Sequence, residues 1–351
     1  MLSNLTIPSH LNPGDKVAAV SLSWGGDEKF RARYEGGKRQ LQENFGLQVV
    51  EMANALKGSE FIYNNPQARA DDLHQAFLDP EIKAVFSIIG GDDSVRLIDK
   101  IDLDIIRHNP KIFMGYSDST VTNFICLAAG LRAYNGPAIL VHFAENGGMH
   151  DYVVDSLRRT LFSNETIGTI EPSIEGWTVE RSPFEDPSTF DKKRTMQPQT
   201  GWNYIQGEHA VSGRLIGGCT DVLAMFIGSK IWPKAEVFDK AILFLENSED
   251  AISADQFTCT LRNFGAQGII QNLSGIIFAK PCRVPIENWP EYDAALKKVT
   301  AEFGRSDLPI VTQMDFGHTD PMFILPIGAM ATIDPLRQRF SINSPGCSFR
   351  Y

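Results

Sequence analysis

A nearly continuous apolar run at residues 82–89 constrains the fold of this chain more than any other feature. A strand of that composition has to be covered on both faces, as in a parallel sheet between layers of helices. Other short apolar runs, each expected to form a strand, lie at residues 17–22, 47–52 and 111–115. Helices are expected at residues 27–44, 69–78, 94–101 and about 118–129. This alternation predicts an α/β fold with a mostly parallel sheet.

The alternation stops between about residues 164 and 207, in a stretch rich in Pro, Ser, Thr, Asp and Glu. Beyond it, strands are expected at 241–246, 275–279 and 309–312, helices at 254–264 and 291–303, and a closing hairpin at 330–342. We therefore expect an N-terminal nucleophile domain at residues 1–165, a connection with loops at 166–207 and a second domain at 208–351. The connection could be a functional lid or a plain crossover, and both interpretations stay open.

The formal charge of −10 argues against binding to nucleic-acid polymers, which needs clusters of Lys and Arg. It does not argue against a small zwitterionic or cationic substrate. The N-terminal residues contain no basic segment and no apolar run long enough for a signal peptide or a membrane span. We therefore expect a cytoplasmic protein with no membrane partner. The five scattered cysteines form no C-x-x-C pair, which favours neither a zinc site nor a disulfide framework.

Residues 111–120, Lys-Ile-Phe-Met-Gly-Tyr-Ser-Asp-Ser-Thr, contain the sharpest local signal in the chain. The predicted strand ends at Gly115, Ser117 follows two residues later, and a helix is expected to begin at once. This is the order of a nucleophile elbow, in which a tight turn exposes a serine beside the positive end of a helix. The pattern departs from the usual G-x-S-x-G at Ser119. Alternatively, Ser117 could only cap the helix.

A glycine pair, Gly90 and Gly91, follows the predicted strand at 82–89 and precedes Asp92. Two glycines allow the backbone to approach a ligand closely. The N–H of Gly91 could therefore form an oxyanion hole together with the N–H of Asp118. The alternative is a plain strand-to-helix turn with an Asp cap, and the pair matches no phosphate-binding motif.

A catalytic serine needs a base, and the base needs a carboxylate that orients it. His318 lies in a tightly turned loop just past a predicted strand, where catalytic groups concentrate. His142 also follows an apolar run and is a competing candidate. Glu246 ends an apolar strand, where a carboxylate is costly unless another group pairs with it. Taken singly, these could also be a surface Glu and a His that only bonds its own loop.

Several motifs lie in this order along almost the whole chain: Leu11-Asn-Pro-Gly-Asp-Lys-Val17, Gly90-Gly91, Gly115-Tyr-Ser-Asp-Ser119, Gly213-Arg-Leu-Ile-Gly-Gly218, Leu243-Phe-Leu-Glu246 and Phe316-Gly-His-Thr319. Together they resemble the serine peptidase family of murein LD-carboxypeptidases and microcin C7 self-immunity proteins. The resemblance implies Ser117 as nucleophile, Glu246 as acid and His318 as base, with oxyanion donors on the backbone of Gly91 and Asp118. It also implies a homodimer that needs no metal and no cofactor.

The resemblance further implies a flavodoxin-like or class I amidotransferase-like N-terminal domain, joined to a smaller C-terminal α/β domain of the swivelling type. Within the family, the sequence Gly-Gly-Asp-Asp-Ser at 90–94 and the long middle segment are more similar to the self-immunity branch. That branch implies a small peptide or peptidyl-nucleotide as substrate, with Asp92, Trp177 and Trp202 as candidate contacts. A tryptophan there could stack on a nucleobase, or both tryptophans could only pack in the core.

Three alternatives remain. One is a murein tetrapeptide carboxypeptidase of cell-wall recycling. Another is a noncatalytic protein that binds a peptide or nucleotide between its domains, although the three residue types of a triad disfavour it. An α/β-hydrolase esterase shares the order Ser, Glu, His, but Ser119 and the absence of an H-G-G-G stretch speak against it.

Overall fold

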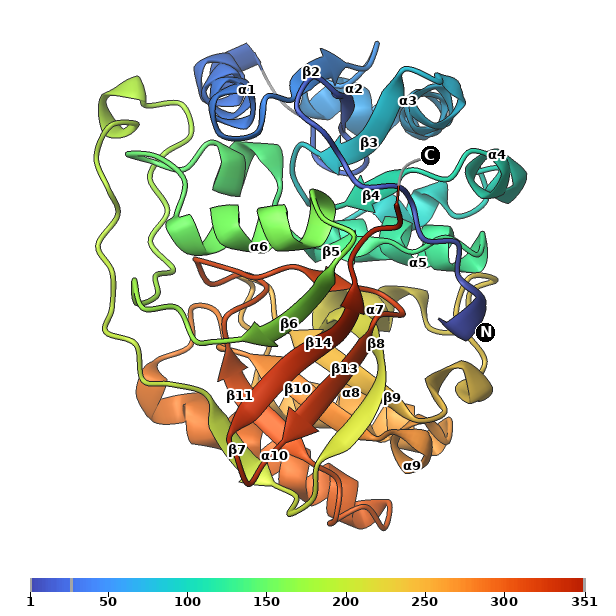
Figure 1. Cartoon of the computed structure of the whole chain (residues 1–351), viewed down its shortest axis with the longest axis vertical. Helices are drawn as coiled ribbons and strands as arrows, with labels where there is room; N and C mark the ends of the chain where they lie inside the picture. The colour runs from blue at the N-terminus through green and yellow to red at the C-terminus, as the bar shows by residue number, and fades with distance from the viewer. Residues whose placement is uncertain (1, 26–27, 350–351) are drawn as a thin grey trace.

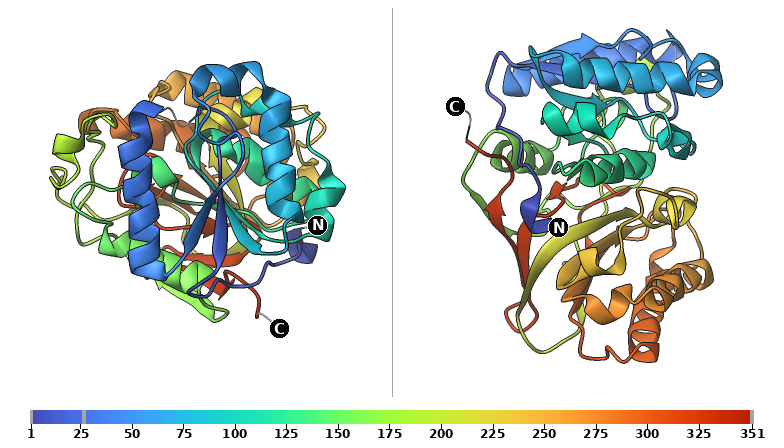
Figure 2. Two further views of the ribbon diagram at one scale, coloured as in Figure 1. Left: turned by 90° about the horizontal axis from the view of Figure 1, so that it is seen from above. Right: turned by 90° about the vertical axis from the view of Figure 1, so that its right-hand side faces the viewer.

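The computed structural model describes residues 2–25 and 28–349, so Asp27, the first residue of one expected helix, lies outside the described residues. The chain folds into two units, each built on one sheet, that are stacked on each other (Figures 1 and 2). The expected two-domain α/β architecture is therefore confirmed. No helix among these residues is both long enough and apolar enough to cross a membrane.

The N-terminal sheet has the strand order β12-β5-β4-β3-β1-β2, and every pair except β12 with β5 is parallel. Helices cover both of its faces (Figure 2), which is why its central strands are largely apolar. The strands are β1 (Lys16–Val20), β2 (Gln48–Glu51), β3 (Ile82–Ser87), β4 (Ile112–Met114), β5 (Tyr134–Asn135) and β12 (Leu325–Pro326). The helices are α1 (Arg31–Phe45), α2 (Ser59–Asn64), α3 (Pro66–Leu78), α4 (Leu103–His108), α5 (Thr120–Ala128) and α6 (Asp151–Leu161). The helix expected at 94–101 is only a 3₁₀ turn, Ser94–Leu97.

The second sheet has the order β6-β14-β13-β8-β9-β10-β11-β7, with a parallel centre from β8 to β11 and antiparallel strands at both edges. Its strands are β6 (Thr166–Ile170), β7 (Asn203–Gln206), β8 (Val211–Cys219), β9 (Ala241–Glu246), β10 (Gly275–Ala279), β11 (Ile310–Met314), β13 (Met330–Asp334) and β14 (Arg339–Pro345). Its helices are α7 (Thr220–Phe226), α8 (Ala254–Ala266), α9 (Ile269–Asn272) and α10 (Trp289–Glu302). The expected closing hairpin is β13 with β14.

Two segments differ from the expected domain limits. The segment 166–207, expected as a connection with loops, adds β6 and β7 to the edges of the second sheet. The C-terminal part in turn supplies β12 to the first sheet. The domain that was expected to be the smaller therefore carries the larger sheet. The sequence did not predict β6 and β7, because polar edge strands give little periodic signal.

The helix α5 joins the two units at the point where the first one carries Ser117. Residues 120–127 of this helix are all buried. The Thr120 hydroxyl accepts a hydrogen bond from the N–H of Cys219, at the end of β8, over 3.1 Å. Next to it, a Cβ on Gly218 would come within 2.4 Å of Thr120. The first turn of α5 is thus held directly against the second domain.

Candidate active site

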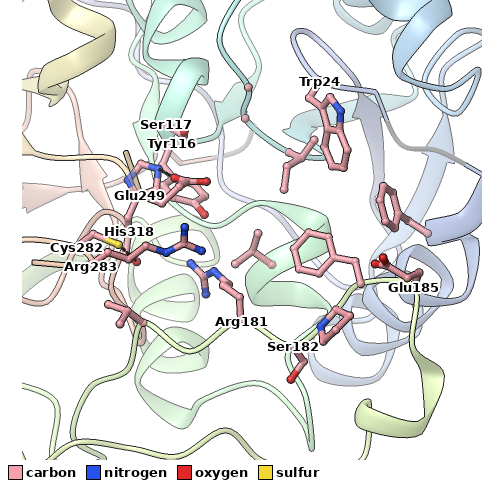
Figure 3. A pocket seen from close by; sticks show the side chains of 18 residues that line it. Trp24, Tyr116, Ser117, Arg181, Ser182, Glu185, Glu249, Cys282, Arg283 and His318 are labelled. Atoms are coloured by element: carbon pink, nitrogen blue, oxygen red, sulfur yellow. Dashed lines mark hydrogen bonds and ion pairs between the residues drawn. The ribbon is translucent and has the colours of Figure 1, made fainter. Parts of the chain in front are cut away.

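A cavity of about 500 Å³ lies between the two domains, and residues of both line it. Tyr116 and Ser117 come from the first domain, just after β4, and His318 comes from the second, just after β11. Figure 3 shows Ser117, Glu249 and His318 at one end of this cavity. Residues between 179 and 185 form one of its walls, so the segment expected as a connection also shapes the site.

Ser117 lies in a tight turn between β4 and α5, where the sequence predicts one. Its φ of 59° is in the left-handed region, which costs a residue other than glycine on the order of 1–3 kcal/mol. Of residues 111–120, Ser117 alone is not buried. A Cβ on Gly90 would be 2.7 Å from its Oγ, so the glycine is needed beside the serine. The turn therefore presents the hydroxyl at the start of a helix, as a nucleophile elbow does.

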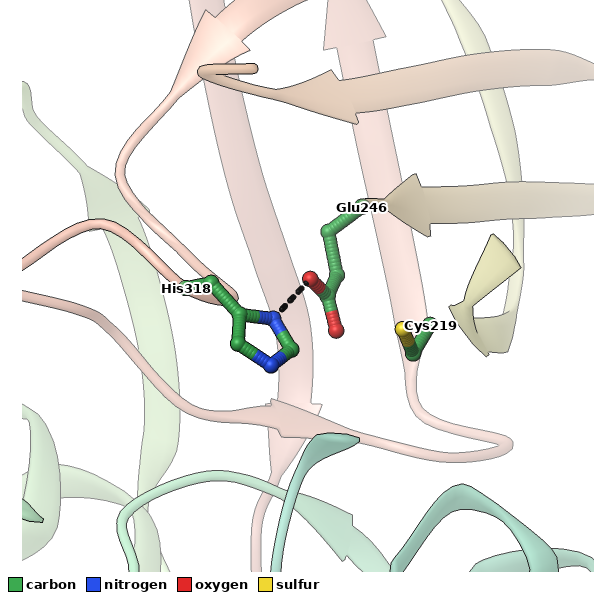
Figure 4. Close-up of side chains that lie close together, drawn as sticks. All are labelled: Cys219, Glu246 and His318. Carbon is green, nitrogen blue, oxygen red and sulfur yellow. Dashed lines mark hydrogen bonds and ion pairs between the residues drawn. The ribbon is translucent and has the colours of Figure 1, made fainter. Parts of the chain in front are cut away.

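Glu246 and His318 form a buried pair at the ends of β9 and β11, the two strands that flank β10. Nδ1 of His318 donates a hydrogen bond to Oε2 of Glu246 over 2.5 Å (Figure 4). Burial by itself lowers the pKa of His318, but the carboxylates of Glu246 and Glu249 outweigh burial and raise the pKa to about 10. This is the arrangement of an imidazole with its orienting carboxylate, and the two carboxylates favour its protonated form.

The other imidazole nitrogen faces a residue that the sequence analysis does not single out. Nε2 of His318 lies 3.1 Å from Oε2 of Glu249, without the alignment of a hydrogen bond. The contact with His318 lowers the pKa of Glu249 to about 2. Within the described residues, Ser117 makes no hydrogen bond to His318, although both line the same cavity. A signal for Glu249 was available, since it lies only three residues after Glu246, in the loop that follows β9.

The loop after β3 packs against the turn that holds Ser117. The Asp118 carboxylate accepts the N–H of Ser94 over 2.8 Å, and the Ser94 hydroxyl donates to the Asp118 carbonyl over 2.8 Å. Gly91 has a φ of 146°, and a Cβ there would come within 2.2 Å of the Ser23 hydroxyl. In the described part of the chain, neither the N–H of Gly91 nor that of Asp118 donates a hydrogen bond. Both remain candidates for an oxyanion hole.

His142, the competing base, has a different role in the structure. Its Nδ1 accepts the N–H of Ala138 over 3.2 Å, and its Nε2 lies 2.9 Å from Oδ1 of Asp320. Burial lowers the pKa of His142, which the Asp320 carboxylate only partly offsets. Asp320 also binds Arg181 and Arg194. His142 therefore belongs to a buried charge network behind the cavity and not to its lining.

Trp177 and Trp202 are not among the residues that line the cavity. Trp177 is buried against Trp289, with ring centroids 5.1 Å apart. Trp202 donates from Nε1 to Asp315 over 2.8 Å and packs on Phe323. Both rings fill space around the second sheet, which favours the packing interpretation, and neither lines the two cavities at Ser117. The aromatic rings that do line the cavity are Trp24, Phe30, Tyr116 and Phe184.

Asp92 is exposed and lines a second cavity, of about 350 Å³, that adjoins the first. The two cavities share four lining residues, namely Trp24, Gly91, Ser117 and Glu249. The sequence analysis placed Asp92 near the site, but it missed the neighbours that complete this second cavity, which come from the second domain.

Three buried side chains could be considered as metal ligands. Atoms of Cys219, Glu246 and His318 lie within 4.8 Å of one another (Figure 4). However, Nδ1 of His318 and the Glu246 carboxylate already bond each other. Burial raises the pKa of the Cys219 thiol well above its usual range, so the sulfur is a protonated and weak ligand. The same atoms are better explained as the acid–base pair of the site.

Comparison with known proteins places this site in a family. Residues 17–136 match the LD-carboxypeptidase N-terminal domain, and residues 212–333 match the LD-carboxypeptidase C-terminal domain. A protein of Vibrio cholerae named as a carboxypeptidase is 29% identical, over 92% of this chain and 93% of its own. The microcin C7 self-immunity protein MccF of Escherichia coli is 26% identical, over 97% of this chain and 96% of its own.

Solved structures agree. An MccF-like protein from Streptococcus pneumoniae in complex with AMP has a TM-score of 0.85 and 27% identity, over 94% of this chain and 99% of its own. MccF in complex with aspartyl sulfamoyl adenosine has a TM-score of 0.82 and 25% identity, over 98% of this chain and 100% of its own. The two domain matches follow each other in the order expected and cover most of the chain, so the protein is a peptidase that belongs to the LD-carboxypeptidase family.

Proposed function

We propose that the protein is a serine carboxypeptidase or amidohydrolase that cleaves the amide bond of a peptidyl- or aminoacyl-nucleotide, as a self-immunity enzyme would. The observation that carries this proposal is the lining of the larger cavity. Arg181 and Arg283 reach into it, and Trp24 lies across from them (Figure 3). Two guanidinium groups suit an anionic phosphate, and aromatic rings suit a flat nucleobase.

The arginine side of the cavity is built to stay charged. Arg181 pairs with Asp320, which is fully buried. Burial alone would raise the pKa of Asp320, but the charges of Arg181 and Arg194 outweigh burial and lower it well below its usual range. The aromatic wall is continuous, because the ring centroid of Phe30 lies 5.1 Å from that of Trp24 and 5.9 Å from that of Phe184. The relatives support the same substrate class, since they include MccF and structures with AMP or aspartyl sulfamoyl adenosine.

The proposed mechanism uses the residues already described. Deprotonated His318 takes the proton of Ser117, whose Oγ attacks the amide carbonyl while Glu246 holds the imidazole in place. The N–H groups of Gly91 and Asp118 stabilise the negative oxygen. The bond between carbon and the amide nitrogen breaks, and His318 gives its proton to the leaving nitrogen. Water, deprotonated by His318, then hydrolyses the acyl-enzyme and releases the acid and Ser117.

A murein tetrapeptide is the second candidate substrate. The same two arginines could bind the C-terminal carboxylate of a peptide, and the family takes its name from LD-carboxypeptidase activity. Cytoplasmic location and a homodimer stay predictions of the sequence analysis.

Incubation with both substrate classes tests the proposal. Purified protein and a Ser117→Ala control are each incubated with a hydrolysable aminoacyl-nucleotide analogue, with a nonhydrolysable analogue as the blank. Both proteins are separately incubated with a murein tetrapeptide. Release of the amine product is followed by mass spectrometry. We expect the wild type to release the nucleotide part and the control to release none. Faster release of the terminal residue of the murein peptide would favour the second candidate. No turnover of either, with Ser117 unlabelled by a fluorophosphonate, would contradict both.

A further inference from the structure

The two cavities that meet at Ser117 differ in charge. The larger one is mixed, with Arg181 and Arg283 together with Glu249 and, at its far rim, Glu185 (Figure 3). The smaller one presents four carboxylates, and no Lys, Arg or His lines it in the described residues; the four are Asp92, Asp221, Glu249 and Asp250. Because a cleft of one charge sign concentrates ligands of the other sign, the smaller cavity favours a cationic part of a substrate, while the two arginines of the larger one remain available to an anionic part.

The smaller cavity, called here the acidic cavity, also suits the length of a long side chain. Val222 and Met225 supply apolar surface beside the carboxylates, which fits methylene groups that end in a charge. Asp221 is held in place because its Oδ2 accepts the N–H of Ser248 over 2.8 Å. Its Oδ1 is buried and has no hydrogen-bond partner among the described residues. Asp221 is thus positioned by the loop after β9 that also carries Glu249.

Glu249 connects the acidic cavity to the catalytic base. It lines both cavities, and its Oε2 lies 3.1 Å from Nε2 of His318. The imidazole is buried, and this nitrogen makes no hydrogen bond to any residue that the structure describes. In this arrangement Glu249 occupies the face of His318 that has to receive the proton of Ser117. Two carboxylates on one imidazole favour its protonated form, which cannot act as a base.

Glu249 is placed to move. Its side chain is 53% exposed, whereas that of His318 is 3% exposed. It belongs to the loop after β9, in which Ala251 has a positive φ of 51°. Its contact with His318 lacks hydrogen-bond alignment and its own side chain is exposed, so a cation in the acidic cavity can reach the Glu249 carboxylate and compete with the imidazole for it.

We propose that the acyl part of the substrate carries a cationic group that binds in the acidic cavity, pairs with Glu249 and draws its carboxylate away from Nε2 of His318. Asp221 and Asp250 select the cation, and Glu249 links its binding to release of the base. The inference rests on the proposed function, because it assigns the anionic leaving part to the arginine side. It adds the class of acyl group, namely a lysine-like or arginine-like residue.

Binding to the Ser117→Ala protein tests the inference without turnover. The ligands are lysyl-, norleucyl- and aspartyl-sulfamoyl adenosine, which share the α-ammonium and the nucleoside and differ in side-chain charge. We expect lysyl to bind about tenfold more tightly than norleucyl in calorimetry at low salt, with aspartyl weakest. A lysyl preference below about threefold, or tighter binding of aspartyl, would overturn the inference.

Variants separate selection from release of the base. Asp221→Asn and Asp250→Asn, made in the Ser117→Ala protein, should each reduce the lysyl preference by about threefold or more, whereas exposed Asp255→Asn on α8 should leave it unchanged. In protein with Ser117 intact, Glu249→Gln should raise kcat for a neutral acyl substrate and lower it for a lysyl one, so their ratio falls towards one. An unchanged kcat ratio would contradict the linking role of Glu249.

The outcomes distinguish this inference from the proposed function. Binding without a charge preference, accompanied by turnover, would overturn the inference alone. A lysyl preference in binding, accompanied by no turnover of any substrate, would support the acidic cavity while contradicting the hydrolase. Failure of all three ligands to bind would overturn both, since the nucleoside would then have no site.

Discussion

The nucleophile half and the acid–base half of the site are held in different ways. Ser117 is fixed by neighbours in its own loop and by the adjacent glycine pair, through a strained φ and close backbone packing. Glu246 and His318 are 72 residues apart and meet only because β9 and β11 flank the same strand. The nucleophile half therefore depends on local packing, and the acid–base half depends on the sheet. Substitution of Ser117 should change mainly the chemistry, whereas substitution of Glu246 should also lower the stability.

The largest expected effect on activity is at Ser117. Ser117→Ala should lower kcat by several orders of magnitude, on the scale of about 10⁴–10⁶ known for triad nucleophiles. Since Ala keeps the Cβ and the same turn, the melting temperature should stay close to that of the wild type. Both are measured on one preparation, and a substantial residual kcat that survives repurification would contradict the assignment of the nucleophile.

Glu246→Ala should damage both activity and stability. It leaves a buried imidazole without its partner, and breaking a buried pair costs about 3–5 kcal/mol, while an absent orienting carboxylate costs about 10⁴ in kcat. Denaturant unfolding compared with Glu246→Gln is the measurement, because Gln keeps the volume and loses the charge. If Glu246→Ala unfolds like the wild type, the buried pair contributes little to the stability of the fold.

Gly90→Ala tests how tightly the nucleophile loop is packed. The added Cβ would be 2.7 Å from Oγ of Ser117, so the turn has to shift, and a displacement of the reacting group costs about 10²-fold in kcat/KM. Gly36→Ala on α1 is the matched control, since nothing lies within 4 Å of a Cβ there. We expect the control to keep full activity, and equal activity of both variants would show that the loop is not tightly packed.

These contrasts also explain what the sequence could and could not predict. The apolar runs around β3, β4 and β9 and the turn at Ser117 are local patterns, and the structure has each of them where it was expected. The edge strands β6 and β7 are half-exposed and polar, so their pairing depends on partners far along the chain. The same holds for Arg181 and Phe184, which line the cavity only because an irregular segment folds back over it.

Glu249→Gln should shift the pH dependence of the reaction. His318 has to lose a proton to act as a base, so its raised pKa of about 10 predicts a rate that still rises above neutral pH. Removing the Glu249 charge lowers that pKa, and the acid limb of kcat/KM for a neutral substrate should move to lower pH. Glu246 still faces the imidazole and keeps part of the raised pKa of His318. The other groups that face the imidazole, Tyr116 on its ring and Arg181 in the same cavity, are unchanged in this variant.

The same pKa makes a statement about stability. A histidine whose folded pKa lies above its unfolded value of about 6.5 contributes stability that is complete below that value and is lost as the pH rises towards 10. The free energy of unfolding should therefore fall between these limits, and less so in Glu249→Gln. A slope equal in both proteins would mean that Glu249 does not hold the proton on His318.

The smallest effect on activity is expected at Trp202, which separates packing from substrate binding. Trp202→Phe keeps the ring against Phe323 but loses the 2.8 Å hydrogen bond to Asp315, which costs about 1.5–3 kcal/mol for a charged acceptor. Because the ring does not line the cavity, kcat/KM for a nucleotide substrate should stay within about twofold of the wild type. Trp24→Phe, on the cavity wall, is the comparison and should raise KM while leaving stability nearly unchanged. If Trp202→Phe instead raised KM and Trp24→Phe did not, the nucleoside would have to bind on the side of the second sheet, and the assignment of the aromatic wall would fall.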